Sequence, residues 1–271
     1  MANESQKPVV VSSSQAPLFA AEQKALFCEV IQLLEQNQVR FAVSGAFALH
    51  EYTGIWRDTK DLDLFLPAEE AVRALHLLQG ANFQTEIADA VWLAKAWRDG
   101  FFVDLITGMS NAVVCVDASW IHRALRTNIF GVSVRVLQPE ELIASKIFVT
   151  RRERFDAADI CHVIYGTRGS MDWKRLLGLL GEHWQMLLWH LVLYHYIYPA
   201  DTSAVPEEVW EELLQRFKVE LAHPNKALEF RGSLIDEMMF AIDVSEWGRR
   251  DILEEQRRSA KRILHGHLEA A

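Results

Sequence analysis

The chain has little cysteine and no excess of basic charge. Its 271 residues include three cysteines, Cys28, Cys115 and Cys161, an odd number spaced far apart. Such a set favours reduced core thiols in a cytosolic protein over a disulfide framework. The formal net charge is −9. An acidic chain does not attract a nucleic-acid backbone as a whole, so any contact with RNA or DNA would need a local basic patch.

The chain also lacks a long apolar run. Its most apolar stretch, Met186 to Ile197, is interrupted by two histidines. It is shorter than the roughly 20 residues of a membrane span, so we expect a buried helix and no membrane partner. Residues 1–20 have neither the charged start nor the apolar segment of a secretion signal and are expected to form a flexible leader.

The first half of the chain carries strand and helix patterns in alternation. Val39–Val43 is predicted to be a short buried strand that turns at Gly45 directly into a helix. The run KDLDLFL alternates strictly, as a half-buried strand does, and ends before Pro67. Two further strand-like runs, VWLAKAW and FFVDLIT, flank Asp99 and Gly100, which form a strong hairpin signal. A last strand is expected over Ile129–Leu137.

The remaining patterns are helical. Helices are predicted over 21–37, from Pro67 to Leu78, and over 139–149, 155–165, 172–181, 183–197, 207–221 and 245–264, with 198–206 as a linker. The sequence therefore predicts an α+β fold. A mixed β-sheet core with flanking helices spans 21–138, and a helical region spans 139–271.

Asp61 and Asp63 stand two positions apart on one predicted strand. Their carboxylates leave the same face, roughly 7 Å apart at the backbone, and could converge on one cation. The same pattern also describes an ordinary strand with one solvated face.

Asp104 lies in FFVDLI, a run that is apolar on both faces. A carboxylate in such a strand is costly unless a cation or hydrogen bonds compensate it. Beside Asp61 and Asp63 it would complete an oxygen cage for a hard divalent ion. The alternative is a pair with an arginine such as Arg57.

Two further features bear on phosphate binding. Ser44 and Gly45 lie between the end of a predicted strand and the start of a predicted helix. Small residues there let a phosphate approach backbone N–H groups. Close helix packing would explain them equally. Lys146 lies on the apolar side of its predicted helix with no acid three or four positions before it. Either a phosphate partner or a stem that snorkels over the core would account for it.

The segment VSGAFALHEYTGIWRDTKDLDLF resembles the signature of the nucleotidyltransferase superfamily: a glycine-containing turn, a helix, Asp-x-Asp on a strand and a third Asp on a later strand. The resemblance covers roughly residues 38–165 and is strongest to bacterial members such as relatives of AbiEii-type toxins and of antibiotic nucleotidyltransferases. It implies a nucleotidyltransferase-like fold and a cytoplasmic enzyme that uses Mg²⁺ or Mn²⁺ and an NTP.

The resemblance also implies roles for single residues. Asp61 and Asp63 would bind the metal, and Asp104 would complete the site and activate an acceptor hydroxyl. Ser44 and Gly45 would hold the triphosphate, and Thr59, Lys60 and Lys146 would contact the nucleotide. The family usually has Gly-Gly or Gly-Ser in the turn, whereas this chain has Ser-Gly-Ala. The sequence therefore supports triphosphate binding less strongly than it supports metal binding.

Three readings of function follow. The first is transfer of a nucleotide to a hydroxyl acceptor, either a small molecule or tRNA. The second is a degenerate module that binds a nucleotide or a partner protein, as the altered turn permits. The third is a toxin or phage-defence enzyme that acts on tRNA, against which the acidic charge argues. The sequence names neither the acceptor nor the NTP, and it sets no oligomeric state.

Overall fold

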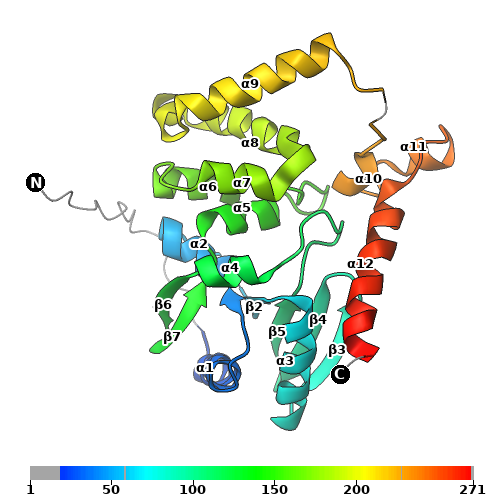
Figure 1. Cartoon of the computed structure of the whole chain (residues 1–271). Helices are drawn as coiled ribbons and strands as arrows, with labels where there is room; N and C mark the ends of the chain where they lie inside the picture. The colour runs from blue at the N-terminus through cyan, green and yellow to red at the C-terminus, as the bar shows by residue number, and fades with distance from the viewer. Residues whose placement is uncertain (1–18, 58, 227, 270–271) are drawn as a thin grey trace, which may run out of the picture.

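The computed structural model describes residues 19–57, 59–226 and 228–269, and it shows a mixed sheet with helices on both sides and a helical region after it (Figure 1). The α+β prediction is confirmed. The sheet has seven strands in the order β3-β4-β5-β2-β1-β7-β6. In chain order these are β1 (Ala42–Val43), β2 (Asp61–Phe65), β3 (Gln84–Asp89), β4 (Leu93–Arg98), β5 (Phe101–Ile106), β6 (Leu125–Ile129) and β7 (Val132–Val136).

Helices surround the sheet and fill the second half of the chain. The first half contains α1 (Ala21–Gln36), α2 (Gly45–Thr53), α3 (Ala68–Gly80) and α4 (Ala118–Arg123). After the sheet come α5 (Pro139–Lys146), α6 (Ala157–Thr167), α7 (Trp173–Leu180), α8 (Trp184–Ile197), α9 (Glu207–Ala222), α10 (Gly232–Ile235), α11 (Ala241–Ser245) and α12 (Ile252–Glu269). Among the residues that the structure describes, no helix is both long and apolar enough to cross a membrane.

The strand pairing determines which side chains meet. β2 and β5 are parallel neighbours, and their register sets Asp63 directly beside Asp104. β4 and β5 form the expected hairpin around Asp99 and Gly100, whose positive φ angles of 55° and 81° suit a two-residue primed turn. The same hairpin sets Lys95 opposite Asp104 on its other side.

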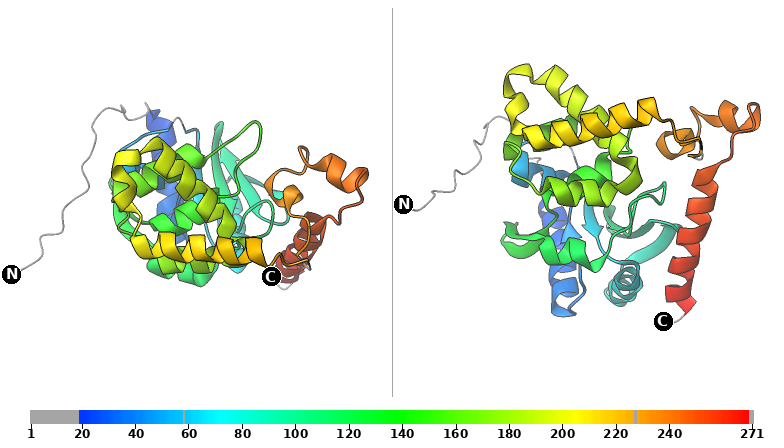
Figure 2. Two further views of the ribbon diagram at one scale, coloured as in Figure 1. Left: turned by 90° about the horizontal axis from the view of Figure 1, so that it is seen from above. Right: turned by 45° about the horizontal axis from the view of Figure 1, so that its top comes forward.

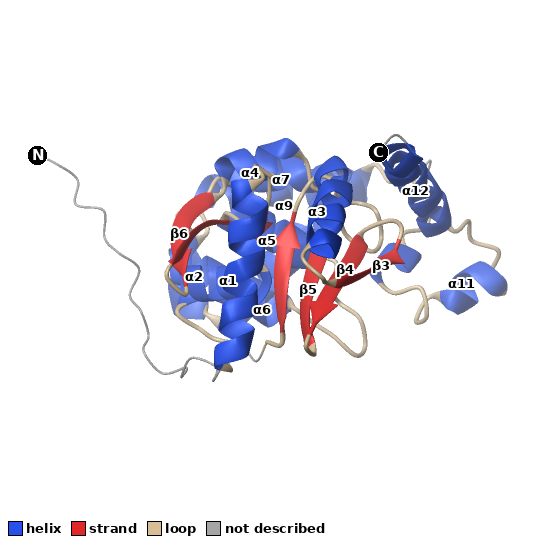
Figure 3. Cartoon of the chain, turned by 90° about the horizontal axis from the view of Figure 1, so that it is seen from below, coloured by secondary structure: helices blue, strands red, loops and turns tan. Residues whose placement is uncertain are grey.

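The helices lie in two groups, one on each face of the sheet. Seen from below, α1 and α3 lie in front of the strands, and α2, α5 and α6 lie behind them (Figure 3). α8 packs against α6 and α9 packs against α8, so the helical region stacks outward from the second group. At the other end of the molecule α12 packs against α3, beyond the β3 edge (Figure 2).

One continuous hydrophobic core runs through the sheet and the helices after it. It includes Phe27 of α1, Leu64 of β2, Ile143 of α5 and Leu213 of α9, all fully buried. The helical region therefore packs on the same core as the sheet. The division at residue 138 and the leader over 1–20 stay predictions, and most of that leader lies outside the described residues.

Several predicted elements differ from the structure. The run Ile129–Leu137 does not form one strand. It contains the end of β6, a turn at Phe130 and Gly131 with positive φ angles, and β7. β3 was not expected, because its mostly exposed residues at the sheet edge show no apolar alternation. The predicted helix 245–264 is α12, which begins at Ile252, and the predicted linker 198–206 contains a short 3₁₀ segment over Pro199–Ala204.

Candidate active site

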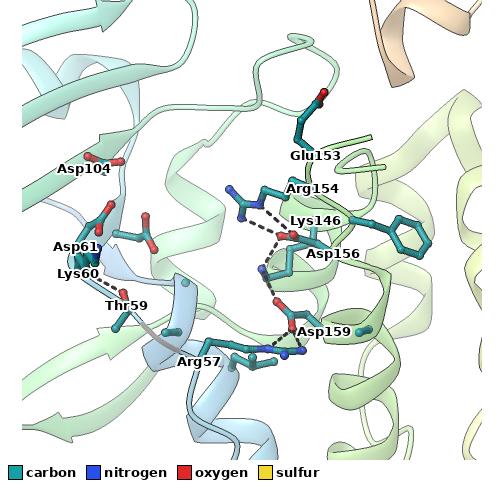
Figure 4. A pocket seen from close by; sticks show the side chains of 16 residues that line it. Arg57, Thr59, Lys60, Asp61, Asp104, Lys146, Glu153, Arg154, Asp156 and Asp159 are labelled. Carbon is teal, nitrogen blue, oxygen red and sulfur yellow. Dashed lines mark hydrogen bonds and ion pairs between the residues drawn. The ribbon is translucent and has the colours of Figure 1, made fainter. Parts of the chain in front are cut away.

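A cavity of about 700 Å³ opens between the strands β2 and β5 and the start of α6 (Figure 4). The N-terminus of α2 and the end of α5 also reach it. Its ionisable and hydroxyl-bearing lining residues are Arg57, Thr59, Lys60, Asp61, Asp63, Asp104, Lys146, Glu153, Arg154, Asp156 and Asp159. The close-up shows Asp61 and Asp104 on the strand side, facing Lys146, Arg154 and Asp156 on the helix side.

The three aspartates predicted from the sequence meet on the strand side. Asp63 pairs in register with Asp104 on the adjacent strand, and Asp61 lies two positions earlier on the same face. Burial raises the pKa of Asp63 to about 6, and the charges of Asp104 and Asp61 add to the effect. Three carboxylates crowded in this way repel one another, and a cation among them would relieve that repulsion.

Gly45 is required by the position of Asp63. Its φ is +58°, and a Cβ atom at Gly45 would lie 1.8 Å from Oδ2 of Asp63. The backbone N–H of Ser44 donates to the carbonyl of Asp63 at 2.9 Å, which fixes the turn against β2. The glycine therefore makes room for the carboxylate, a function that the sequence pattern alone did not reveal.

Asp104 has a cation of its own. The Nζ atom of Lys95 lies 2.9 and 3.1 Å from its two carboxylate oxygens. Burial raises the pKa of Asp104 and the Lys95 ammonium opposes that rise, leaving the pKa above its usual range. The suggested alternative partner, Arg57, is wrong, because its guanidinium binds Asp159 at 2.6 Å instead.

The carboxylates suit a hard divalent ion in chemistry and position. Among the described residues, no hydrogen bond or ion pair engages the carboxylates of Asp61 or Asp63, and the carboxylate of Asp63 lies close against the backbone of Gly45. As the side chains stand, the described residues contain no group of three or more His, Cys, Asp or Glu arranged as a complete metal site. The Asp104 side chain would have to turn from Lys95 to join Asp61 and Asp63 on one ion.

The helix side of the cavity carries a closed network of ion pairs. Lys146 Nζ lies 2.9 Å from both Asp156 and Asp159, and the Lys146 and Asp156 side chains are only 10% and 9% exposed. Arg154 donates two hydrogen bonds of 2.9 Å to Asp156. Burial acts to raise the pKa of Asp156, but Arg154 and Lys146 outweigh it and hold the pKa below its usual range.

This network gives Lys146 partners that the sequence did not reveal, and its predicted contact with the nucleotide stays a prediction. No acid precedes it within a helical turn, but two acids follow it ten and thirteen positions later, across the turn that a bridge between Thr150 and Phe155 closes. Lys146 is neither unpaired nor simply snorkelling. Asp156 stands at the N-cap position of α6 without accepting a side-chain cap hydrogen bond.

The other predicted residues are close to the same site. Thr59 and Lys60 line the cavity, and the hydroxyl of Thr59 donates to the carbonyl of Asp61 at 3.1 Å. Ser44 is buried behind the turn and lines a second, adjoining cavity. The sequence-based site did not include Lys95, Arg57, Arg154, Asp156 or Asp159. Lys95 could have been predicted, because counting residues back from the expected turn at Asp99 and Gly100 sets it opposite Asp104.

The chain resembles several solved nucleotidyltransferase structures weakly. A nucleotidyltransferase-like antigenic protein from Paracoccidioides brasiliensis is 23% identical, with 70% of this chain and 96% of that chain covered and a TM-score of 0.46. The enzyme ANT(2'')-Ia in complex with adenylyl-2''-tobramycin is 13% identical, with 61% and 99% covered and a TM-score of 0.44. Lincomycin-bound LnuA, a lincosamide adenylyltransferase, is 12% identical, with 53% and 96% covered and a TM-score of 0.37.

These values carry no conclusion about substrate. Among curated proteins no match is found. A model of one protein family, described as nucleotidyl transferase of unknown function (DUF2204), matches residues 23–218. That range is most of the chain and contains the carboxylates, the Gly45 turn and the ion-pair network. The chain therefore belongs to this nucleotidyl transferase family.

Proposed function

We propose that the protein transfers a nucleoside monophosphate from an NTP to the hydroxyl of an acceptor, with Mg²⁺ or Mn²⁺ held by Asp61, Asp63 and Asp104. The observation that carries the proposal is the crowding of these carboxylates at one cavity wall. Asp63 in particular is held against Asp104 with a raised pKa and no cation bound to its carboxylate among the described residues. A structural role would leave such a costly group unexplained.

The large cavity supplies the nucleotide side of the reaction. Its volume of about 700 Å³ lies within the range of about 300–1,000 Å³ typical of ligand pockets. The N-terminal end of α2 reaches this cavity at Gly45 and Ala46 and offers a positive helix end, which favours a triphosphate, whereas the N–H of Ser44 is already bound to Asp63. Thr59 and Lys60 line the cavity beside it, and Lys146 adds a cation on the helix side.

The chain's own residues would act on both ends of the transferred bond. The acceptor oxygen attacks the α-phosphorus in line, forming a P–O bond while the bond from the α-phosphorus to the leaving oxygen of pyrophosphate breaks. Asp104, whose pKa is raised, accepts the hydroxyl proton. Lys146 and Arg154 balance charge on the departing pyrophosphate. Bound Mg²⁺ would supply the electrostatic stabilisation of the attacking and leaving oxygens.

Transfer of label tests this proposal. Each α-³²P-labelled NTP is incubated with Mg²⁺ or Mn²⁺ and with bacterial tRNA or a metabolite extract. We expect label on one acceptor class and its loss in the Asp61→Ala, Asp63→Ala double variant. The control is Glu86→Ala, which removes an exposed carboxylate from β3 of the same sheet.

The alternatives predict other results. A degenerate binding module would bind nucleotide, seen as thermal stabilisation, without releasing pyrophosphate or moving label. A toxin acting on tRNA would label tRNA and arrest growth on induced expression. Label transfer that persists in the double variant would contradict the assignment of the carboxylates.

A further inference from the structure

A second, smaller cavity lies against the same carboxylates. Its volume is about 230 Å³, and it adjoins the large cavity along a shared boundary. The boundary residues, which line both cavities, are Gly45, Asp63, Asp104, Lys146, Arg154 and Asp156. The predicted reacting groups thus lie between a large space and a small one.

The geometry of in-line transfer assigns a use to the small cavity. The attacking oxygen must approach the α-phosphorus from the side opposite the leaving pyrophosphate. If the triphosphate occupies the large cavity, the acceptor must approach across Asp63 and Asp104. We infer that the small cavity receives the acceptor, and that the acceptor is a small, ring-bearing hydroxyl compound that carries an anionic group. This inference rests on the proposed function.

The small volume limits the size of the acceptor. At about 230 Å³ it lies below the range of about 300–1,000 Å³ that is typical of ligand pockets. It holds a compound built around a single ring. The large cavity, by contrast, has about three times this volume.

The walls of the small cavity favour an apolar ring. Away from the boundary, its lining is mainly aromatic and aliphatic side chains from β2 and β5, the turn before β4, the loop after β5, the segment after α5, and α10. These are Phe65, Trp92, Ile106, Met109, Phe148, Val149 and Leu234. Aromatic rings bury large apolar areas and stack on flat partners, so a ring would be held by this surface.

The charges that line the small cavity favour an anion once the metal of the proposed function neutralises Asp63, which also lines it. Asp104 is paired with Lys95, and Asp156 holds both Lys146 and Arg154. Arg151 lines the cavity, is exposed, and donates to the hydroxyl of Ser110 at 3.0 Å. Within the described part of the chain no carboxylate lies within ion-pair distance of it; its charge acts on Asp236 from farther away, and its guanidinium can still bind a ligand.

The segment after α9 completes the wall. The side-chain amide of Asn111 donates to the carbonyl of Leu234 at 3.1 Å, which ties α10 to the loop after β5. Asp236 accepts hydrogen bonds from the backbone of Met238 and Met239 at 2.9 Å, and also from the backbone of Arg152. α10 is thereby fastened to the two loops that carry Ser110 and Arg151. Leu234 lies beyond the residues that the family model matches.

Three matched probes test the charge and ring preference. They are 3-(4-hydroxyphenyl)propionate, which is anionic, 4-propylphenol, which is neutral, and tyramine, which is cationic. Each Kd is measured by ligand-observed NMR on the full chain with Mg²⁺ and α,β-methylene-ATP, whose α–β bridge cannot be cleaved. We expect the anion to bind about three- to five-fold more tightly than the neutral probe, and tyramine to bind most weakly.

Two variants locate the binding, each with a neighbouring control. Arg151→Gln should make the anionic and neutral probes bind equally, whereas Arg152→Gln, whose side chain does not line the cavity, should leave the preference in place. Leu234→Trp should fill the cavity and weaken all three probes at least tenfold. Leu253→Ala loosens the same small apolar cluster without lining the cavity and should not weaken them.

The results separate this inference from the proposed function. The inference is overturned if tyramine or the polycation tobramycin binds best, if no probe binds to protein that binds the nucleotide analogue, or if Leu234→Trp has no effect. If label is transferred to an acceptor but Leu234→Trp leaves the KM for that acceptor unchanged, the proposed function stands and the acceptor pocket is elsewhere. If neither analogue binding nor label transfer occurs, the proposed function fails and the acceptor assignment fails with it.

Discussion

The large cavity has a strand wall, formed by β2 and β5, and a helix wall, formed by the end of α5 and the start of α6. The two walls differ in whether their carboxylates are paired with cations. On the strand wall, Asp61 and Asp63 face the cavity with no cation bound to either carboxylate among the described residues, and Asp63 has a raised pKa. On the helix wall, Asp156 and Asp159 are bound to cations, and the pKa of Asp156 is lowered. The same residue type thus destabilises one wall and stabilises the other.

The difference shows which wall is complete by itself. The helix wall satisfies its own charges, so it can hold Lys146 and Arg154 at fixed positions without any ligand. The strand wall accumulates negative charge that only an added cation or protons would neutralise. Stability sacrificed at one place in a well-packed fold is typical of a functional site.

Asp63→Asn should have the largest effect and opposite consequences for activity and stability. Nucleotidyl transfer should fall by about 10³-fold or more, because the charge proposed to bind the metal is lost. In metal-free buffer at pH 8 the variant should be more stable than the parent by about 1–3 kcal/mol, since a repelled charge is removed. Activity assays and urea unfolding with a chelator provide the two measurements.

The stability gain expected for Asp63→Asn depends on pH, because it requires Asp63 to be ionised in the parent protein. The pKa of Asp63 in the folded state, about 6, lies above its ordinary value of 3.8. Protonated Asp63 therefore contributes stability that is present below about pH 4 and is lost as the pH rises through about 6. The advantage of Asp63→Asn should disappear between pH 8 and pH 4.5. An equal advantage at both values would contradict the raised pKa.

Gly45→Ala should damage the strand wall through the backbone. The new Cβ would meet Oδ2 of Asp63, and the φ of +58° costs a non-glycine residue roughly 1–2 kcal/mol. Displacing the carboxylate should also lower activity by about 10²-fold. Gly80→Ala is the matched control, because a Cβ there meets no atom within 4 Å. Urea unfolding and label transfer should show normal behaviour for Gly80→Ala, and normal behaviour for Gly45→Ala would refute the close approach.

Asp156→Asn should change stability in the opposite direction to Asp63→Asn. It leaves Lys146 and Arg154 without their shared carboxylate, and loss of one partner from a buried network should cost about 1–3 kcal/mol. The folded-state pKa of Asp156 is lowered, so its contribution is present above about pH 4 and is lost on further acidification. Urea unfolding at pH 7 measures the cost, and an increase in stability would remove the contrast between the walls.

The strand wall was largely predictable from the sequence. Strict alternation put Asp61 and Asp63 on one face of β2, and a doubly apolar strand marked Asp104 as costly. Both are short-range patterns of period two, which a single sequence displays directly. The close approach of Gly45 to Asp63 could not be predicted from this pattern, because the approach depends on where α2 and β2 lie in space.

The helix wall was harder to predict because its partners are not at helical spacing. Lys146 meets Asp156 and Asp159 only because the chain reverses between α5 and α6 through an irregular turn. No periodicity encodes that reversal. β3 was missed for a related reason, since an exposed edge strand needs no apolar alternation.

Lys95 is the partner of Asp104 that the register of the β4–β5 hairpin predicts. Its replacement should have the smallest effect of the four substitutions. It binds Asp104 at 2.9 Å and therefore competes with any divalent ion for that carboxylate. Lys95→Met should lower the Kd for Mn²⁺, followed by water proton relaxation, by about three- to ten-fold, because one competing cation is gone. Arg98→Met is the control, since Arg98 belongs to the same strand but pairs with Glu29. Weaker Mn²⁺ binding in Lys95→Met would mean that Lys95 positions Asp104 for the metal instead of competing with it.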